Sequence, residues 1–447
     1  MSVFHPDLAA RPVPRYTSYP TAAEFTATVG AERQGLALLG VERDDVVSLY
    51  VHIPYCREIC WYCGCNTGAV GRETRLGEYR DALLAEIATV AALMEGRVTS
   101  VHFGGGSPNV LSGDALHRIA DAICDSFGVA SDAEWAMELD PRSFHPGQAE
   151  TLAAIGITRV SLGAQTFAPH VQQAINRVQP FEQVAAAARQ LRAAGIAQIN
   201  LDLMYGLPRQ TEQDLADSIA AALTLVPSRV AMFGYAHLPA MLPRQRMIAD
   251  ESLPDAGARF AQSALAHRLF TQNGYQAIGF DHFAQAGDGL ARAMAAGRLH
   301  RNFQGFTDDP ARIVVGLGAS AISHFDGVIV QNEKHVGAYR RTVRTGALAG
   351  VRGVTRTADD RLRGAIIARL LCDGQADIAA LSAAAGVDPD RFATAMDCLA
   401  PLEERGLVRR EGWRVAMRDE DRAYRRLVAS AFDSRRAWAP QRISAAV

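Results

Sequence analysis

Four cysteines lie within ten residues of one another, and three of them have a spacing that suits a metal centre. Cys56, Cys60 and Cys63 follow the pattern C-x3-C-x2-C, and Cys65 comes two residues later. Three thiolates on one short loop can hold three irons of a cubane iron–sulfur cluster and leave the fourth iron without a protein ligand. Because an open metal position can bind and activate a ligand, the loop predicts a reactive 4Fe-4S cluster.

A structural zinc site is the alternative interpretation of this loop, with His52 or Cys65 as a fourth ligand. Zinc sites of that kind usually contain two spaced pairs of cysteines, and the sequence has no second pair. The total of seven cysteines is odd, which argues against a disulfide framework. We expect the other three, Cys124, Cys372 and Cys398, to be buried as small apolar residues.

The composition is that of an ordinary globular protein. Of the 447 residues, 49% are apolar and 21% are charged, and the net charge is −2. This balance provides no general positive field for nucleic acid or a membrane surface. No stretch approaches the roughly 18 apolar residues of a membrane span, and the N-terminus lacks the apolar core of a signal peptide. We therefore expect a cytoplasmic protein that binds neither nucleic acid nor a membrane.

Strands alternate with helices through much of the chain, which predicts βαβ units, a parallel sheet and an α/β fold. Apolar and β-branched runs indicate strands at 46–53, 98–103, 134–139, 159–163, 198–204, 229–235, 275–280 and 313–317. Apolar residues at helical spacing indicate helices at 76–94, 112–127, 146–154, 181–194 and 212–225. At least six βα units fit between residue 46 and about residue 240.

The pattern changes near residue 356. Two alanine-rich helices, at 377–385 and 389–405, precede a short hairpin, and this order is typical of a winged-helix domain. The first 45 residues carry little periodicity, so we expect an extension that wraps on the main domain. The chain is thus divided into an N-terminal extension (1–45), a catalytic domain (46–350) and a C-terminal helical domain (351–447).

Glycines and polar residues follow several of the predicted strands. The triplet 104–106 ends one strand, Glu138 ends the next, and Gln165 follows another. In parallel βα architectures the working groups gather at the carboxyl ends of the strands, so we expect these residues to share one site. Asp202 lies in an apolar strand and needs a polar partner, for which Arg177 is a candidate.

Several motifs resemble those of the radical S-adenosylmethionine (SAM) superfamily and, within it, the oxygen-independent coproporphyrinogen III oxidases. Besides the cysteine loop, they are PRYTSYP at 14–20, YVHIP at 50–54, CGCN at 63–66, GGGSP at 104–108, GLPRQT at 206–211, YAHLP at 235–239 and HRNFQG at 300–305. The resemblance implies a partial (β/α)6 TIM-like barrel with an N-terminal extension and a smaller, mainly helical, winged-helix-like C-terminal domain.

The resemblance also implies roles for individual residues. The 4Fe-4S cluster would be bound by Cys56, Cys60 and Cys63, and Cys65 would matter for activity without being a ligand. The SAM molecule on the cluster would contact Tyr50, Tyr62, Gly105 and Glu138, of which Tyr50 and Glu138 are candidate catalytic residues. A second SAM molecule would contact Gly106, Ser107, Gln165, Arg177, Asp202, Ala236 and Ile322.

The implied reaction belongs to haem biosynthesis. A 5′-deoxyadenosyl radical formed from SAM would start the oxidative decarboxylation of two propionates of coproporphyrinogen III to vinyl groups, giving protoporphyrinogen IX. Arg15 and Arg301 lie in matching motifs and are candidates for binding the substrate carboxylates. An electron donor such as a flavodoxin or ferredoxin is implied as a partner, and we expect a monomer.

The resemblance weakens in places. Ser107 stands where the family has threonine, and Cys372 is followed by Asp373 where the family has asparagine. The divergent C-terminal hundred residues leave open a related radical SAM enzyme that degrades or methylates another tetrapyrrole. A remote alternative from another class is an iron–sulfur redox sensor whose C-terminal domain binds DNA, although the acidic residues of 389–405 oppose phosphate.

Overall fold

The computed structural model describes residues 3–435. Within these residues one twelve-stranded sheet forms the centre of the molecule, in the order β16-β15-β14-β13-β1-β4-β5-β6-β7-β8-β10-β9. Its parallel core confirms the predicted alternation and consists of β1 (Val46–Ile53), β4 (Arg97–Gly105), β5 (Gly128–Leu139), β6 (Arg159–Gln165), β7 (Gln198–Tyr205) and β8 (Arg229–Gly234).

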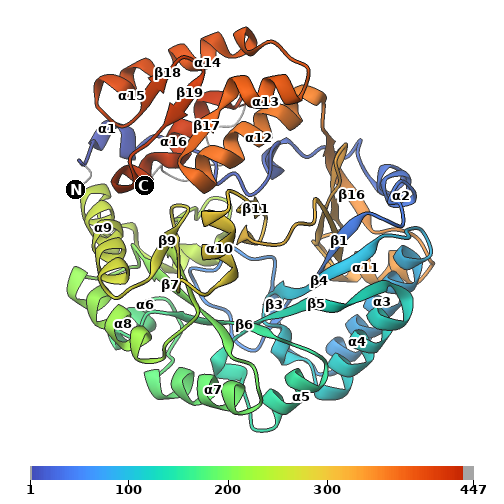
Figure 1. Cartoon of the computed structure of the whole chain (residues 1–447). Coiled ribbons are helices and arrows are strands. Elements are labelled where there is room, and N and C mark those ends of the chain that lie inside the picture. The colour runs from blue at the N-terminus through green and yellow to red at the C-terminus, as the bar shows by residue number, and fades with distance from the viewer. Residues whose placement is uncertain (1–2, 436–447) are drawn as a thin grey trace.

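A row of helices covers the outer face of this curved sheet, as expected for a partial barrel (Figure 1). The row contains α3 (Thr74–Ala91), α4 (Gly113–Ser126), α5 (Gln148–Ala154), α7 (Phe181–Ala193), α8 (Glu212–Thr224) and α9 (Ala256–Gln272). Local caps help to fix where these helices begin. Ser112 accepts a hydrogen bond from Ala115 N, and Thr211 forms a capping box with Asp214, so the first turns have acceptors for their free amides.

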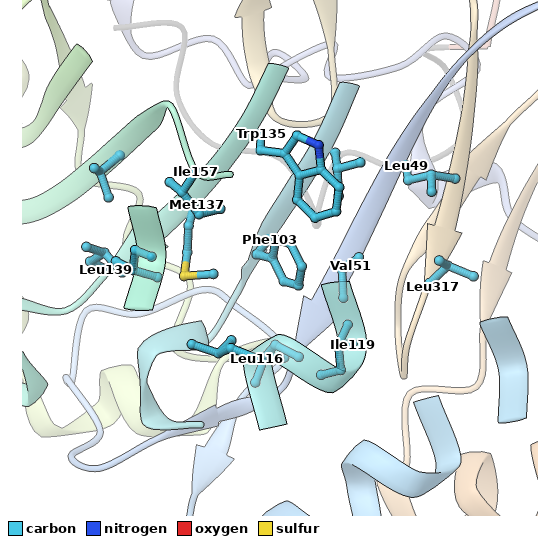
Figure 2. Packing of buried hydrophobic residues seen from close by; sticks show 14 of the residues in the cluster. Leu49, Val51, Phe103, Leu116, Ile119, Trp135, Met137, Leu139, Ile157 and Leu317 are labelled. Carbon is cyan, nitrogen blue, oxygen red and sulfur yellow. The ribbon is translucent and has the colours of Figure 1, made fainter. Parts of the chain in front are cut away.

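The period-two alternation of the strands sorts apolar from polar side chains. In β1, Val47, Leu49, Val51 and Ile53 are fully buried in the main core, whereas Tyr50 and His52 take the alternate positions. Figure 2 shows the apolar face packed against α4, with labelled contributions from Leu49, Val51, Phe103, Trp135, Met137, Leu116 and Ile119. The other face lies inside the barrel and carries the polar residues.

Short strands extend the parallel core on both sides. On one side β13 (Ile313–Leu317) pairs in parallel with β1. It is followed by the antiparallel strands β14 (Ile322–His324), β15 (Val328–Asn332) and β16 (Gly350–Thr355). On the other side β10 (His282–Ala284) and β9 (Gln276–Ile278) are antiparallel. The expected domain boundary at 350/351 falls inside β16.

The C-terminal elements form a second core and lie together on one side of the barrel (Figure 1). They include α12 (Ala358–Asp373), α13 (Ile378–Ala384) and a three-stranded sheet of β17 (Gln375–Asp377), β19 (Arg414–Ala416) and β18 (Arg409–Glu411). Leu8, Val13, Tyr16 and Tyr19 belong to this second core. The start of the N-terminal extension therefore packs with the C-terminal elements rather than only on the main domain, whereas α2 (Ala31–Leu39) contributes Leu38 to the main core.

Two local predictions were wrong. The single helix expected at 389–405 is broken into η6 (Pro389–Phe392), α14 (Ala393–Asp397) and α15 (Ala400–Glu404), because Pro401 has no amide to continue a preceding helix. Of the three scattered cysteines, Cys372 is buried, but Cys124 and Cys398 are exposed. No helix within residues 3–435 is both long and apolar enough to cross a membrane.

Candidate iron–sulfur and SAM site

The cysteine loop leaves the carboxyl end of β1 and returns to pair beside it. Cys56 lies in the short strand β2 (Tyr55–Cys56), which pairs in parallel with β3 (Gly68–Ala69). Its Sγ lies 3.3 Å from Thr67 Oγ1. The backbone N–H of Cys65 donates to the Sγ of Cys63 over 3.4 Å. Cys56 and Cys63 thus each have a polar contact within the loop, whose two ends are joined by the β2–β3 pair.

Cys60 lies between two guanidinium groups that the sequence analysis did not bring together. Its Sγ accepts hydrogen bonds from Arg142 Nη2 at 3.3 Å and Arg177 Nη1 at 3.4 Å. Asp140 holds both arginines, at 2.7 Å and 3.2 Å respectively. Donors with positive charge favour the thiolate, which is the form that binds metal. Asp140 and Arg142 were missed because each follows a strand without any motif that marks it.

The pKa values of the other two thiols move in opposite directions. A hydrogen bond from the side chain of Cys65 lowers the pKa of Cys63 to about 6 and, in return, raises the pKa of Cys65. Burial raises the pKa of Cys56 to about 11. A thiol with the raised pKa of Cys56 must lose its proton when it binds metal, so of these two thiols Cys63 is the better prepared ligand.

This donor set fits a four-iron cluster with one open iron. Three thiolates on one loop can bind three of the four irons. Hydrogen bonds from N–H groups to the sulfurs are known to tune the reduction potential of such clusters. Arg177 Nε is buried without a hydrogen-bond partner in the described residues, so a donor next to the loop remains for an anionic group such as the cluster. His52 is a poor fourth ligand for zinc, because both of its ring nitrogens are bonded, to Tyr50 Oη at 3.1 Å and Asn66 O at 3.2 Å.

A polar row crosses the inner face of the barrel from β1 to β5. Tyr50 stacks on His102 with ring centroids 5.9 Å apart. His102 Nε2 lies 3.4 Å from Glu138 Oε1, and Gly105 N donates to Glu138 Oε2 over 3.2 Å. Burial alone would raise the pKa of Glu138, but the hydrogen bond and charge of His102 outweigh it, so the pKa lies below its ordinary value. Glu138 therefore presents a carboxylate to the barrel interior.

The glycine loop owes its composition to close packing. Gly105 has φ +111°, and a Cβ there would lie 2.6 Å from Cε1 of His52. A Cβ on Gly106 would lie 2.5 Å from Tyr55 O, and its amide donates to Ile53 O over 2.8 Å. Ser107 is 1% exposed and its hydroxyl donates to Asn109 Oδ1 over 2.7 Å. The Gly106 amide and the Ser107 hydroxyl are thus already used within the fold.

Asp202 and Arg177 do not pair, so that prediction was wrong. Asp202 accepts from Ser161 Oγ at 2.8 Å and from Asn200 Nδ2 at 2.7 Å, and burial raises its pKa to about 6. Arg177 instead lies in the loop after α6 (Pro169–Ala174), where it holds Asp140 and donates to Gly163 O over 2.5 Å. The two side chains therefore have separate partners, which linear spacing does not reveal.

Glu138 and Asp202 line a cavity of about 180 Å³ inside the barrel. Its wall also contains charged and aromatic residues that the sequence analysis missed, namely His102, Glu134, Arg159, Arg229, His282, Phe306 and Asp308. Glu134 pairs with Arg159 at 2.9 Å, and Arg229 pairs with Asp288 at 2.6 Å. Because Arg159 and Arg229 are the first residues of their strands, this ionic network lies at the end of the barrel opposite the cysteine loop.

The remaining candidates are spread around the mouth of the barrel. The carbonyls of Tyr62 and Ala236 both accept hydrogen bonds from Gln245 Nε2, at 2.9 Å and 3.1 Å. Gln165 ends β6 in a left-handed conformation with φ +64°. The structure therefore joins Tyr62 to Ala236 through Gln245, a residue that no sequence signal marked.

Three further candidates lie outside these groups. Ile322 starts β14, and its partly buried side chain packs near Phe25. Arg15 donates to Gly234 O at 2.7 Å, at the end of β8. Arg301 lies on the hairpin of β11 (His300–Asn302) and β12 (Gly305–Thr307). Arg15 thus lies at the carboxyl end of the barrel strands, the end from which the cysteine loop also leaves.

Comparison with known proteins agrees with this geometry. Residues 50–222 match the model of the radical SAM superfamily. The chain is 42% identical over 424 residues to an oxygen-independent coproporphyrinogen III oxidase from Bradyrhizobium diazoefficiens, with 94% of each chain covered. It is 37% identical over 423 residues to the oxygen-independent coproporphyrinogen III oxidase of Escherichia coli, covering 94% of this chain and 92% of the relative.

A solved structure is similar over almost the whole chain. The coproporphyrinogen III oxidase (HemN) from Escherichia coli, described as a radical SAM enzyme, superposes with a TM-score of 0.90 at 35% identity. The match covers 94% of this chain and 97% of that one. With relatives of this identity along nearly its full length, the chain belongs to the oxygen-independent coproporphyrinogen III oxidases, a radical SAM family that uses a 4Fe-4S cluster and SAM.

Proposed function

We propose that this enzyme converts coproporphyrinogen III to protoporphyrinogen IX by oxidative decarboxylation of two propionate side chains. The observation that carries the proposal is the cysteine loop with its charged donors on Cys60, in a chain 42% identical to a named oxidase over 94% of its length. In each decarboxylation a hydrogen atom leaves the β-carbon, carbon dioxide leaves, and one electron passes to an acceptor, so that a vinyl group remains.

The cluster would be held by Cys56, Cys60 and Cys63. When bound, the cluster supplies the electron that cleaves SAM to methionine and the 5′-deoxyadenosyl radical. Arg142 and Arg177 donate hydrogen bonds to the Cys60 sulfur and are themselves positioned by Asp140. Binding of the cluster by this loop would therefore depend on the buried ion pairs of Asp140 with Arg142 and Arg177 as well as on the thiols.

SAM on the cluster would lie along the polar row of the barrel. Glu138, kept ionised by His102, is suited to accept the ribose hydroxyls. Tyr50 is fixed by His52 and His102 and offers an aromatic face, and Gly105 and Tyr62 border the same region. Cys65 is hydrogen-bonded to Cys63 and is exposed. It would matter for activity without binding iron.

We propose in addition that the enzyme binds a second SAM molecule. Its proposed contacts are Gly106, Ser107, Gln165, Arg177, Asp202, Ala236 and Ile322. The support is strongest for Gln165, the last residue of β6, and Ala236, two residues after the end of β8. It is weakest for Ser107, because that hydroxyl is buried and bonded to Asn109. Equilibrium dialysis with labelled SAM would give two equivalents per chain if this part is right and one if it is wrong.

The reaction needs an external one-electron donor, and we propose a flavodoxin or a ferredoxin acting on a monomeric enzyme. The test of the main function is anaerobic incubation of cluster-loaded protein with dithionite, SAM and coproporphyrinogen III. Formation of a tricarboxylate intermediate followed by protoporphyrinogen is expected. Deoxyadenosine without any decarboxylated tetrapyrrole would contradict the substrate assignment.

A further inference from the structure

A pocket of about 440 Å³ opens beside the cysteine loop. Its walls include three parts of the chain that meet there, namely the returning limb of the loop (66–69), the start of α3 and the start of α11 (Val336–Val343). The helices α3 and α11 lie side by side (Figure 1). The basic residues of the lining are Arg75, Lys334, His335 and Arg340, and no aspartate or glutamate of residues 3–435 is among its lining residues. The pocket is therefore basic.

The pocket is joined directly to the loop that would hold the cluster. Thr67 lines the pocket, and its Oγ1 lies 3.3 Å from the Sγ of Cys56. Lys334 is attached to the same limb, because its carbonyl accepts a hydrogen bond from Asn66 Nδ2 over 3.2 Å. The side chain of Thr67 thus contacts a proposed cluster ligand and also forms part of the pocket wall.

The protein itself occupies two other sides of the loop. Two guanidinium groups donate to the Sγ of Cys60, and Gln245 is bonded to the carbonyl of Tyr62, the residue before Cys63. In the returning limb, by contrast, residues 66, 68 and 69 are exposed. The returning limb is therefore an accessible side of the loop, and the basic pocket adjoins it.

The positive charge of the pocket is only partly neutralised. Arg340 pairs with Glu78 at 2.6 Å, and its Nε is buried without a hydrogen-bond partner in the described residues. Arg75 and Lys334 are exposed, and neither forms an ion pair within the part of the chain that the structure describes. Two cations beside the loop are thus left for a partner.

The acidic residues near the pocket do not cancel this excess. Glu73 pairs with Arg57 at 2.6 Å. Glu333 accepts a hydrogen bond from His335 N over 2.7 Å, and its charge is offset by the exposed Arg341 on α11. The whole chain has a net charge of −2, so the positive field beside the loop is local and does not follow from a basic composition.

Lys334 is the only lysine in the sequence, and all the others among the 46 lysines and arginines are arginine. Arginine suits fixed two-point ion pairs, whereas lysine carries a hydrated point charge on a flexible stem. Such a charge suits contacts that form and break quickly. The one lysine of the chain therefore lies where a transient partner could approach the cysteine loop.

We propose that this basic pocket, in which Arg75 and Lys334 lack carboxylate partners, is the docking site of an acidic electron-donor protein. The inference rests on the proposed function, which needs one electron from outside for each SAM molecule that is cleaved. In the docked complex the donor is oxidised by one electron and the cluster is reduced by one.

The exposure of the two cations favours a protein over a small anion as the occupant. Exposed cations bind a small anion weakly, because water and salt screen their charge. A protein surface with several carboxylates excludes part of that water on docking, and the local field steers it towards the pocket. Complementary charge of this kind gives fast, salt-sensitive association, as an electron donor that must leave after each transfer requires.

The first test measures binding of cluster-loaded enzyme, under anaerobic conditions, to two acidic probes, a bacterial flavodoxin and a bacterial ferredoxin. At least one is expected to bind, with a dissociation constant that rises as salt is added. Arg75→Glu and Lys334→Glu should each raise that constant about three- to tenfold, because attraction becomes repulsion. Both side chains are exposed, so neither change depends on repacking of a core. Arg189→Glu, at an exposed position of α7, is the matched control and should bind like the wild type.

The single lysine allows a second test that does not depend on charge reversal. Carboxylates of the donor are activated with a carbodiimide before the enzyme is added, so that only amines of the enzyme can react with them. The wild type should give a cross-linked heterodimer in which Lys334 is the linked residue. Lys334→Arg keeps the charge, so it should retain affinity but lose the cross-link. A heterodimer that persists in Lys334→Arg would place the donor at the N-terminal amine and would overturn the site.

A small cationic reductant separates docking from catalysis. Reduced methyl viologen needs no basic surface, so it should support equal SAM cleavage in the wild type and all variants, whereas cleavage driven by the protein donor should fall in Arg75→Glu and Lys334→Glu. Unchanged donor affinity in both variants, or no binding of either probe to the wild type, would overturn the docking site. A wild type that cleaves SAM with methyl viologen but forms no vinyl product would instead overturn the proposed function, so the two failures are distinguishable.

Discussion

Arg177 donates a hydrogen bond from Nη1 to the Sγ of Cys60 over 3.4 Å, and the same guanidinium holds Asp140 at 3.2 Å. Arg142 repeats this arrangement from the other side, with 3.3 Å to the sulfur and 2.7 Å to the carboxylate. One carboxylate therefore fixes two guanidinium groups on a single sulfur. Of the three proposed cluster ligands, Cys60 is the buried one, and its sulfur accepts hydrogen bonds from both arginines.

Arg177→Gln is expected to make the cluster harder to reduce. Removing a buried positive charge next to Cys60 destabilises the more negative, reduced state, and the reduction potential should fall by roughly 60 mV, about a tenfold change for one electron. Redox titration followed by electron paramagnetic resonance measures the shift. Arg57→Gln is the matched control, because Arg57 lies in the same loop but pairs with Glu73 at the surface; an equal shift in both variants would contradict a local effect.

Glu138→Gln is expected to weaken SAM binding about tenfold, because the ribose hydroxyls would lose a charged acceptor. The lowered pKa of Glu138 means that its carboxylate is ionised at neutral pH, and its contribution to SAM binding is lost only as the pH falls into the acid range. Isothermal titration of SAM from pH 8 down to pH 4 checks both points, with affinity kept to pH 5 and decreasing only below it. The exposed Glu150→Gln on α5 should bind like the wild type, and an unaltered affinity in the Glu138 variant would remove this residue from the site.

Gly105→Ala should reduce SAM cleavage by about a hundredfold or more, since displaced groups at an active site lose near-attack geometry. The new Cβ would lie 2.6 Å from Cε1 of His52, so the ring must move and release Tyr50. Gly147→Ala is a matched control with φ +81° and no atom within 4 Å of the added Cβ. Its backbone strain is comparable, and similar losses in both variants would assign the effect to strain rather than to His52.

Glu86 should make stability depend on pH near neutrality. It is fully buried and accepts hydrogen bonds from Gly318 N at 2.6 Å, Asn332 Nδ2 at 2.7 Å and Tyr339 Oη at 2.6 Å. Burial raises its pKa from 4.5 to about 7. The pKa of Glu86 is higher in the folded state than in the unfolded state. Its contribution to the free energy of unfolding is therefore complete below pH 4.5 and is lost as the pH rises towards 7.

The expected loss across that window is roughly 3 kcal/mol, since one pKa unit corresponds to about 1.4 kcal/mol. Urea unfolding at pH 5, 6, 7 and 8 measures it. Glu86→Gln should remove this pH dependence and also lower stability by about 1–3 kcal/mol, because its NH2 group would face donors. A wild-type stability that rises between pH 5 and pH 7 would contradict the assignment.

The sequence predicted the parallel core well because the barrel strands are short, apolar and β-branched, and because their spacing leaves room for one helix each. The bounds of β1 and β13 agree with the predicted 46–53 and 313–317. The helix α9 and the break at Pro401 were not anticipated. A long α-helix without a marked apolar stripe, and a proline inside an otherwise helical run, are weak signals along a single chain.

The cysteine spacing predicted an iron–sulfur cluster, with zinc as the alternative, since ligands within one loop need no tertiary fold to come together. Which charges surround those ligands was decided only by folding. Asp140 and Arg142 come from the end of one strand and Arg177 from a later loop, and they meet at Cys60 because parallel strands end at one edge of the sheet. Arg15 and Gly234 likewise become neighbours only when the N-terminal segment packs over the barrel, because long-range proximity arises from packing of the cores and leaves no periodic trace in the sequence.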